Sequence, residues 1–119
     1  MEFTVKKDIN ISKNVTNGTT LDFFSFQVPS EAKMTVTHFA NGMDEFDAWG
    51  HITWIFKRNG ILIEPYGAIK DQIAFGAPLR ELAGLEIQGG DLFQVFVKNE
   101  YIDPVKVRIA LKYEMLQVK

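Results

Sequence analysis

Apolar and polar residues alternate with a period of two along most of this chain. The alternation is longest near the C-terminus, where every second position from residue 105 to residue 115 is apolar. These apolar positions are Val105, Val107, Ile109, Leu111, Tyr113 and Met115. Successive side chains of a strand point to opposite faces of its sheet, so the pattern predicts a long strand with one buried and one solvated face.

A β-hairpin is predicted at residues 52–63, where two alternating apolar runs flank Asn59-Gly60. Asn-Gly is the preferred pair for a two-residue type I′ turn, because both positions need a positive φ. Such a turn places Phe56 opposite Ile63. The apolar residues that then share one face are Ile52, Trp54, Phe56, Ile61 and Ile63. We expect this face to be core; a ligand-binding platform around Trp54 is the alternative.

Shorter alternating runs predict further strands at residues 19–29, 33–39 and 91–99 and a short strand near the N-terminus. Residues 85–88 are predicted to end another strand, before a Gly89-Gly90 turn. Phe24, Phe26 and Val28 alternate in the first run, and Met34, Val36 and His38 in the second. Residues 10–19 are rich in turn-forming residues and are predicted to be a polar loop. The predicted core contains Trp54, Phe56, Phe93, Val95, Val107, Ile109 and Leu111.

About eight short, regularly spaced strands predict an all-β fold, an antiparallel sandwich or barrel. Residues 1–119 are expected to form a single domain, with residues 1–19 as an N-terminal arm or an edge strand. No stretch shows a convincing helical period beyond one turn in residues 78–85.

The composition and charge of the chain argue against several classes of protein. The chain has no cysteine, which excludes disulfides, thiolate metal sites and a cysteine nucleophile. A formal net charge of −2 gives no general attraction to nucleic acid or anionic membranes. No run of 18 apolar residues is present, and the first residues do not resemble an export signal. Synthesis in the cytoplasm is therefore expected, without binding to nucleic acid or membrane.

Few residues carry candidate chemistry. His38 and His51 could share a metal only if folding brings them together. The carboxylates of Asp44, Glu45 and Asp47 could hold calcium, but their spacing does not match the known helix–loop–helix calcium loop. No nucleophile–base motif is present. We therefore expect no enzyme activity, no cofactor and no metal site.

A basic stripe is also predicted on the polar face of the last strand, formed by Lys106, Arg108 and Lys112. Tracking a phosphate backbone would need more positive charge and interleaved aromatic residues. We interpret the stripe as a solvated face.

Large apolar residues occur where no strand is predicted. Residues 39–50 are expected to be irregular and include Met43, Phe46 and Trp49. The segment after the hairpin contains Tyr66, Ile69 and Phe75. Loops usually run over the surface, and aromatic residues and methionine are enriched at protein interfaces. The predicted partner interface comprises Met43, Phe46, Trp49, Tyr66 and Phe75. Loops that fold back to cap the core are the open alternative.

The order of the runs "VPSEAKMTVTHF", "ITWIFKRNGILI", "LEIQGGDLFQVFVKN" and "VKVRIALKYEML" resembles small β-sandwich accessory proteins of tailed bacteriophage virions, such as capsid decoration or cement proteins. The resemblance covers about residues 20–116. It implies a jelly-roll-like sandwich with a structural role in the virion. It also implies binding to capsid or tail subunits, commonly as a homo-oligomer. The competing class is a carbohydrate-binding or receptor-binding module, which uses the same sandwich with exposed aromatic residues.

Overall fold

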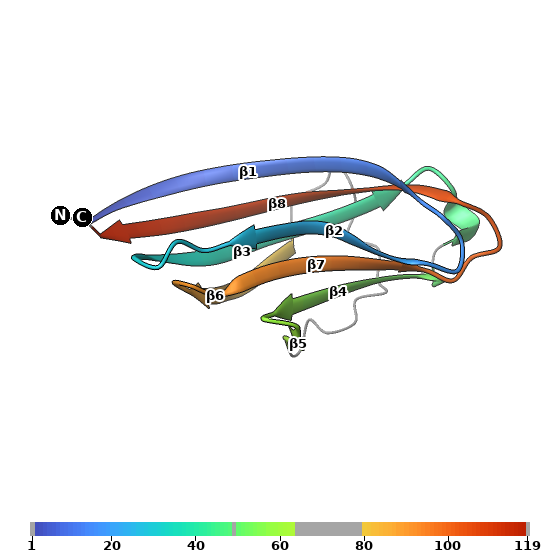
Figure 1. Ribbon diagram of the computed structural model, residues 1–119. Helices are drawn as coiled ribbons and strands as arrows, with labels where there is room; N and C mark the ends of the chain where they lie inside the picture. Colours follow the sequence, from blue (N-terminus) through green and yellow to red (C-terminus); the bar gives the residue numbers. More distant parts are fainter. Residues whose placement is uncertain (1, 49, 64–79, 119) are drawn as a thin grey trace.

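The computed structural model describes residues 2–48, 50–63 and 80–118. Within them the chain forms eight strands and one short 3₁₀ helix (Figure 1). The elements are β1 (Glu2–Val15), β2 (Thr20–Gln27), β3 (Ala32–Met43), η1 (Phe46–Ala48), β4 (Ile52–Arg58), β5 (Ile61–Leu62), β6 (Arg80–Gln88), β7 (Leu92–Asn99) and β8 (Val105–Val118).

The strands form two four-stranded antiparallel sheets packed face to face. Sheet A has the order β1-β8-β3-β6 and sheet B the order β2-β7-β4-β5. β1 thus pairs with β8, β2 with β7, β3 with β6 and β4 with β5. A single long hairpin wrapped into two sheets gives this order, which is the jelly roll. The predicted all-β sandwich of about eight strands is confirmed.

The N-terminal segment forms more strand than the sequence predicts. β1 pairs with β8 along its whole length, from Glu2 opposite Val118 to Val15 opposite Val105. The expectation of a polar loop from residue 10 onward is therefore wrong, because the strand continues to Val15 and only residues 16–19 turn. β1 lies at the edge of sheet A, and the two described ends of the chain lie side by side (Figure 1).

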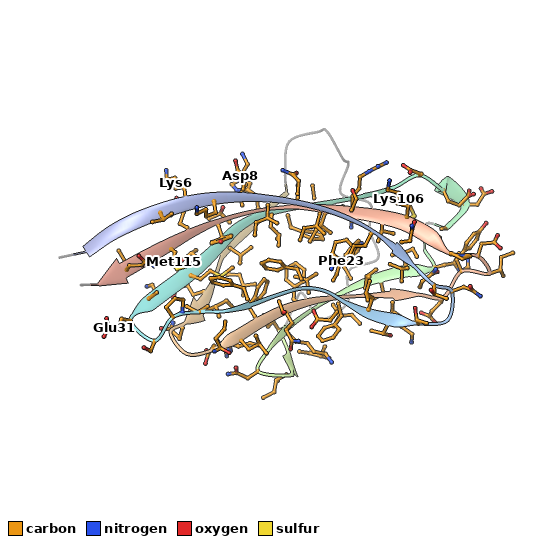
Figure 2. The ribbon with its side chains drawn as sticks, turned by 45° about the horizontal axis from the view of Figure 1, so that its top comes forward. Lys6, Asp8, Phe23, Glu31, Lys106 and Met115 are labelled. Atoms are coloured by element: carbon orange, nitrogen blue, oxygen red, sulfur yellow. The ribbon has the colours of Figure 1, made fainter. Side chains whose placement is uncertain are left out.

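The hydrophobic core lies between the sheets. All seven predicted core residues are buried, namely Trp54, Phe56, Phe93, Val95, Val107, Ile109 and Leu111. In Figure 2 the side chains of Phe23 and Met115 point between the sheets, whereas Lys6, Asp8 and Lys106 point away. Edge-to-face ring contacts cross the core, including Phe39 of sheet A on Phe56 of sheet B at 5.2 Å between ring centroids. Edge-to-face packing is the favoured geometry for aromatic pairs.

A bulge in β3 changes which residue faces the core. The register of β3 against β8 shifts between Val36 and His38, so Thr37 is the extra residue. An extra residue reverses the alternation beyond it. Phe39 is consequently buried and His38 faces outward, which contradicts the predicted pairing of His38 with Met34 and Val36 on one face.

A second bulge lies in β2, where the register against β7 shifts between Asp22 and Phe24. Phe23 is the extra residue and is 1% exposed. Phe24 and Phe26 pack against the core as predicted, and Val28 is buried. The bulge therefore adds one aromatic ring to the core that alternation alone does not place there.

The Asn59-Gly60 hairpin forms with the predicted turn. Asn59 has a φ of 52° and Gly60 a φ of 81°, as a type I′ turn requires. The amide of Ile63 donates to the carbonyl oxygen of Phe56 at 2.9 Å, which is the predicted register. Ile61, however, is 72% exposed and is not core; it lies on the edge strand β5, opposite Arg58 of β4.

Asn99 is a fully buried polar residue that joins four segments. Its Nδ2 donates to the carbonyl oxygens of Val15 and Asp103, each at 3.0 Å. Its Oδ1 accepts from the amide of Tyr101 at 2.8 Å. Its backbone amide donates to Thr19 at 3.0 Å. The side chain therefore uses both amide hydrogens and its oxygen to hold β1, β7 and the β7–β8 connection together.

We expect Trp54→Ala to lower the free energy of unfolding by about 3–5 kcal/mol, because the side chain is buried and its loss leaves a cavity. Chemical denaturation measures this loss. Leu62→Ala is the control, since Leu62 is 49% exposed and its truncation should cost less than about 0.5 kcal/mol. A comparable loss in both variants would contradict the assigned burial of Trp54.

We expect Asn99→Leu to cost about 2–4 kcal/mol, because it leaves two buried carbonyl oxygens and one amide without their partner. Asn99→Asp should be destabilising at neutral pH and less so in acid, since only the protonated carboxyl can donate to a carbonyl oxygen. Denaturation at several pH values tests both variants. Asn10→Ala, at an exposed position, is the control. A cost of Asn99→Asp that is independent of pH would overturn the hydrogen-bonding role.

Candidate protein-binding surface at the loop end

One end of the sandwich gathers three connections, here called the loop end. They are the β1–β2 turn (residues 16–19), the β3–β4 connection (residues 44–51) and the β7–β8 connection (residues 100–104). The amide of Gly18 donates to the carbonyl oxygen of Asn99 at 2.8 Å, and the amide of Glu100 donates to that of His51 at 2.8 Å. Hydrogen bonds thus join the β1–β2 turn to the end of β7, and the β7–β8 connection to the β3–β4 connection.

The β3–β4 connection is shorter than the sequence predicts. β3 continues to Met43, which is 5% exposed and belongs to the core. Met43 therefore lies in a strand, and its side chain offers little surface to a partner. After it, η1 is held by Ala48, which is fully buried and whose amide donates to the carbonyl oxygen of Glu45 at 3.2 Å.

The other predicted interface residues are distributed as follows. Phe46 begins η1 and so belongs to the loop end. Trp49, Tyr66 and Phe75 lie outside the described residues. Among the described residues, Phe46 is therefore the one predicted interface residue that remains a candidate at the loop end.

Two residues that sequence reasoning missed lie in the β7–β8 connection. Ile102 is 79% exposed, the highest value among the exposed large apolar residues of the described chain. Tyr101 is half-buried, and its ring centroid lies 5.6 Å from that of His51. The Asp103-Pro104 pair of "EYIDP" predicts a turn and gives no reason to expect a surface there. Two adjacent large apolar residues inside a turn are the signal that could have identified this surface.

Carboxylates surround these apolar groups. The exposed acids of the loop end are Asp44, Glu45, Asp47, Glu100 and Asp103. Arg108 of β8 forms an ion pair with Asp44, and Lys98 lies 3.9 Å from Glu100. Partial desolvation raises the pKa of Tyr101, and the negative charges of Glu45, Asp47 and Asp103 raise that pKa further. The loop end is therefore an acidic surface with a projecting isoleucine.

The carboxylates of the β3–β4 connection have protein partners. The Asp44 carboxylate contacts Arg108, and Glu45 Oε1 accepts from the amide of Asp47 at 3.2 Å. Among the described residues, no group of three or more histidines and carboxylates is arranged to hold a metal ion. His38 lies on the outer face of sheet A and His51 at the loop end, so the fold does not bring the two histidines together.

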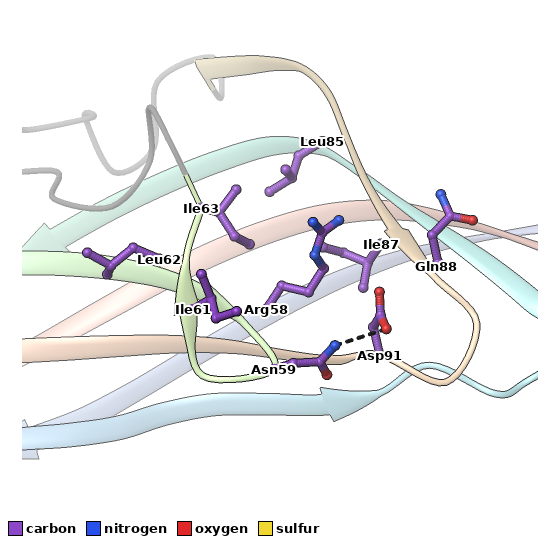
Figure 3. Close-up of a pocket in the computed structure, with 9 residues that line it drawn as sticks. All are labelled: Arg58, Asn59, Ile61, Leu62, Ile63, Leu85, Ile87, Gln88 and Asp91. Carbon is purple, nitrogen blue, oxygen red and sulfur yellow. Dashed lines mark hydrogen bonds between the residues drawn. The ribbon is translucent and has the colours of Figure 1, made fainter.

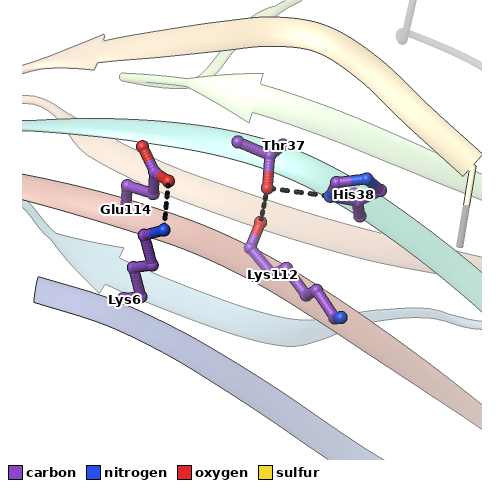
Figure 4. A network of polar contacts seen from close by, with 5 residues as sticks. All are labelled: Lys6, Thr37, His38, Lys112 and Glu114. Carbon is purple, nitrogen blue, oxygen red and sulfur yellow. Dashed lines mark hydrogen bonds and ion pairs between the residues drawn. The ribbon is translucent and has the colours of Figure 1, made fainter.

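A second polar cluster occupies the outer face of sheet A beside the β3 bulge (Figure 4). The Thr37 hydroxyl donates to the carbonyl oxygen of Lys112 at 3.2 Å. That hydroxyl has a single hydrogen, so the contact of 3.0 Å between His38 Nδ1 and Thr37 Oγ1 requires Nδ1 to donate. Lys6 and Glu114 lie 3.7 Å apart across the shallow depression there, whose volume is about 330 Å³.

The predicted basic stripe follows this same outer face. Lys106 and Lys112 are exposed, whereas Arg108 is directed to Asp44. Asp8 pairs with Lys112 across the strands, and Glu114 is next but one along β8. This face therefore carries charges of both signs.

Comparisons with known proteins place the chain in no family. No known protein family matches it, and no curated protein is similar to it. In the described part of the chain, no helix is long and apolar enough to cross a membrane.

We expect Glu45→Gln and Asp47→Asn each to lower the pKa of Tyr101, because each removes a negative charge that opposes formation of the tyrosinate. Titration of the Tyr101 ring resonances by NMR at alkaline pH measures this shift. Asp22→Asn, in edge strand β2, is the control. A Tyr101 pKa that both loop variants leave unchanged would contradict the proximity of these carboxylates.

Proposed function

We propose that this domain is a structural accessory protein of a bacteriophage virion, which docks onto assembled capsid or tail subunits as a homo-oligomer. The loop end is the docking surface. The observation that carries the proposal is the exposure of Ile102 beside Tyr101, within a ring of carboxylates and next to η1.

This arrangement has the composition of a protein interface. Interfaces place aromatic and apolar residues at their centre and polar groups at their rim. Here Tyr101 and Ile102 supply the centre, and Glu45, Asp47 and Asp103 supply the rim. The carboxylates also keep the uncomplexed surface soluble. In sequence, Phe46 and Trp49 belong to the same β3–β4 connection.

The architecture supports the same role. Jelly rolls occur in viral capsid and lectin domains, although a fold alone does not determine function. The two described ends of the chain lie at the end of the sandwich opposite the loop end (Figure 1). Docking through the loop end would therefore leave both chain ends directed away from the partner. The proposal assigns the domain no catalytic role and locates it in the virion.

A carbohydrate-binding or receptor-binding module is the alternative function. The neighbouring aromatic rings of His51 and Tyr101 at the loop end, tilted by 45° to each other, favour it, since aromatic faces can stack on sugars. The aromatic ring of Phe96, on the outer face of sheet B, offers a sugar less stacking surface, because the Lys57 ammonium lies over that ring at 4.8 Å from its centroid. The alternative therefore depends on the same loop end and can be tested there.

Co-sedimentation with assembled capsid or tail particles tests the proposal. We expect Phe46→Ala, Trp49→Ala and Ile102→Asp each to weaken capture about thirtyfold, because loss of one interface anchor costs about 2 kcal/mol. Ser25→Asp, at an exposed position of β2, is the control and should bind like the wild type. Circular dichroism establishes that each variant is folded.

Two results would overturn the proposal. Folded loop variants that are captured like the wild type would show that the docking surface lies elsewhere. A wild-type protein that ignores particles but binds a glycan on an array, with binding lost in Tyr101→Ala, would establish the carbohydrate module instead.

A further inference from the structure

Three asparagines of the chain are followed directly by glycine, namely Asn17, Asn41 and Asn59. An asparagine in such a pair can lose its side-chain amide without an enzyme, because the backbone nitrogen of the glycine can attack the side-chain carbonyl carbon. Glycine leaves that nitrogen unhindered, since it has no Cβ. The reaction requires contact with water and a side chain that can turn toward the glycine nitrogen. The fold provides these conditions unequally to the three pairs.

The Asn41-Gly42 pair is shielded from water. Asn41 lies in β3 and its side chain is fully buried. The pairing of β3 with β8 holds the backbone, with Asn41 opposite Ile109 and Gly42 opposite Arg108. The central strands of a core open only when most of the structure opens. We therefore expect this pair to stay intact while the protein is folded.

The Asn59-Gly60 pair is exposed at the hairpin turn, but hydrogen bonds hold its side chain. Asn59 Nδ2 donates to the Asp91 carboxylate at 3.0 Å (Figure 3). Asn59 Oδ1 accepts from the amide of Leu92 at 2.8 Å. Both polar atoms of the side-chain amide therefore have partners. A turn of this group toward the Gly60 nitrogen would break two hydrogen bonds.

The Asn17-Gly18 pair meets both conditions. It forms the middle of the β1–β2 turn, which the amide of Thr19 closes by donating to the carbonyl oxygen of Thr16 at 3.3 Å. Asn17 is exposed, and no described residue forms a hydrogen bond with its side chain. The amide of Gly18 donates to the carbonyl oxygen of Asn99 at 2.8 Å, so this contact must open before the nitrogen can react. Exposed turns open at a lower cost in free energy than core strands.

We propose that Asn17 is a site of spontaneous deamidation in the folded protein and the most reactive of the three pairs. The Gly18 nitrogen loses its proton and bonds to Asn17 Cγ. The bond between Cγ and Nδ2 breaks, and Nδ2 leaves as ammonia with that proton. The product is a succinimide ring. Water then opens the ring at either of its carbonyl carbons, which leaves aspartate or isoaspartate at position 17.

The modification changes the loop end. Either product adds a carboxylate to a surface on which Glu100 and Asp103 are already exposed. Isoaspartate also lengthens the main chain next to Gly18, which displaces the hydrogen bond between Gly18 and Asn99. The inference is independent of the proposed docking function, since the reaction requires only the turn and water.

Peptide mapping by mass spectrometry, after incubation of the folded wild type at mildly alkaline pH, tests the inference. We expect Asn17 to convert at least about tenfold faster than Asn41 or Asn59, because the turn opens at the lowest cost in free energy. The same incubation in denaturant is the control. There all three pairs should convert at similar rates, because the fold no longer protects two of them. Asn17→Gln should abolish conversion in the β1–β2 turn, since the longer side chain closes a ring far more slowly.

Equal rates at Asn17 and Asn59 in the folded protein would overturn the inference. An Asn17 that stays intact in the folded protein while the unfolded chain converts would overturn it too. Asp91→Ala tests the reason for the difference, because it removes the partner of Asn59 Nδ2. It should raise the rate at Asn59 and leave the rate at Asn17 unchanged. An unchanged rate at Asn59, in a variant that circular dichroism shows to be folded, would contradict the protection assigned to this hydrogen bond.

Discussion

The register of β8 is the constraint on which the sandwich depends. β8 is the second strand of sheet A, and it pairs with β1 over fourteen residues on one side and with β3 on the other. Its inward residues, from Val105 to Met115, are all buried. A shift of one residue would turn all of these side chains to solvent, so burial fixes the register of both neighbouring strands. Once β1 and β3 are in place, the complementary pairings β2–β7 and β4–β5 follow from the connections of the jelly roll.

The sequence predicts this fold where the alternation is regular, and fails where a bulge or a long polar side chain interrupts it. The Asn59-Gly60 pair predicts the hairpin turn, and period two predicts β8 and the buried positions of Trp54, Phe56 and Phe93. Thr37 and Phe23 do not, because an extra residue in a strand has no distinct signature in a single sequence. Turn-forming residues such as Asn10 and Asn14 conceal the second half of β1, where Lys13 occupies an inward position opposite Val107. Its ammonium donates to the carbonyl oxygen of Phe23 at 2.9 Å and lies 5.3 Å from the centroid of that ring, so a charged residue is accommodated at the core margin.

The candidate site was predictable only in part, for a related reason. Apolar residues in an irregular stretch predicted a surface at the β3–β4 connection, and the loop end lies there. The sequence places Met43 in this surface because the bulge at Thr37 reverses the alternation. A regular period of two therefore does not show that β3 continues to the buried Met43. Ile102 was missed because a turn motif, Asp103-Pro104, accounts for the segment without regard to the residue before it. The sequence also does not show which strands become the edges of the two sheets, because strand order depends on contacts between distant segments.

Asn99 contributes both to the stability of the fold and to the geometry of the proposed docking surface. The side chain that joins β1 to β7 also holds the amide of Tyr101 and the carbonyl oxygen of Asp103, the two residues that flank Ile102. Ile102 therefore projects from a connection whose backbone is fixed on both sides by a buried amide group. Ordering a loop on binding costs free energy, and a surface already held in one conformation avoids most of that cost. The proposed docking through Ile102 would therefore require little further ordering of this connection.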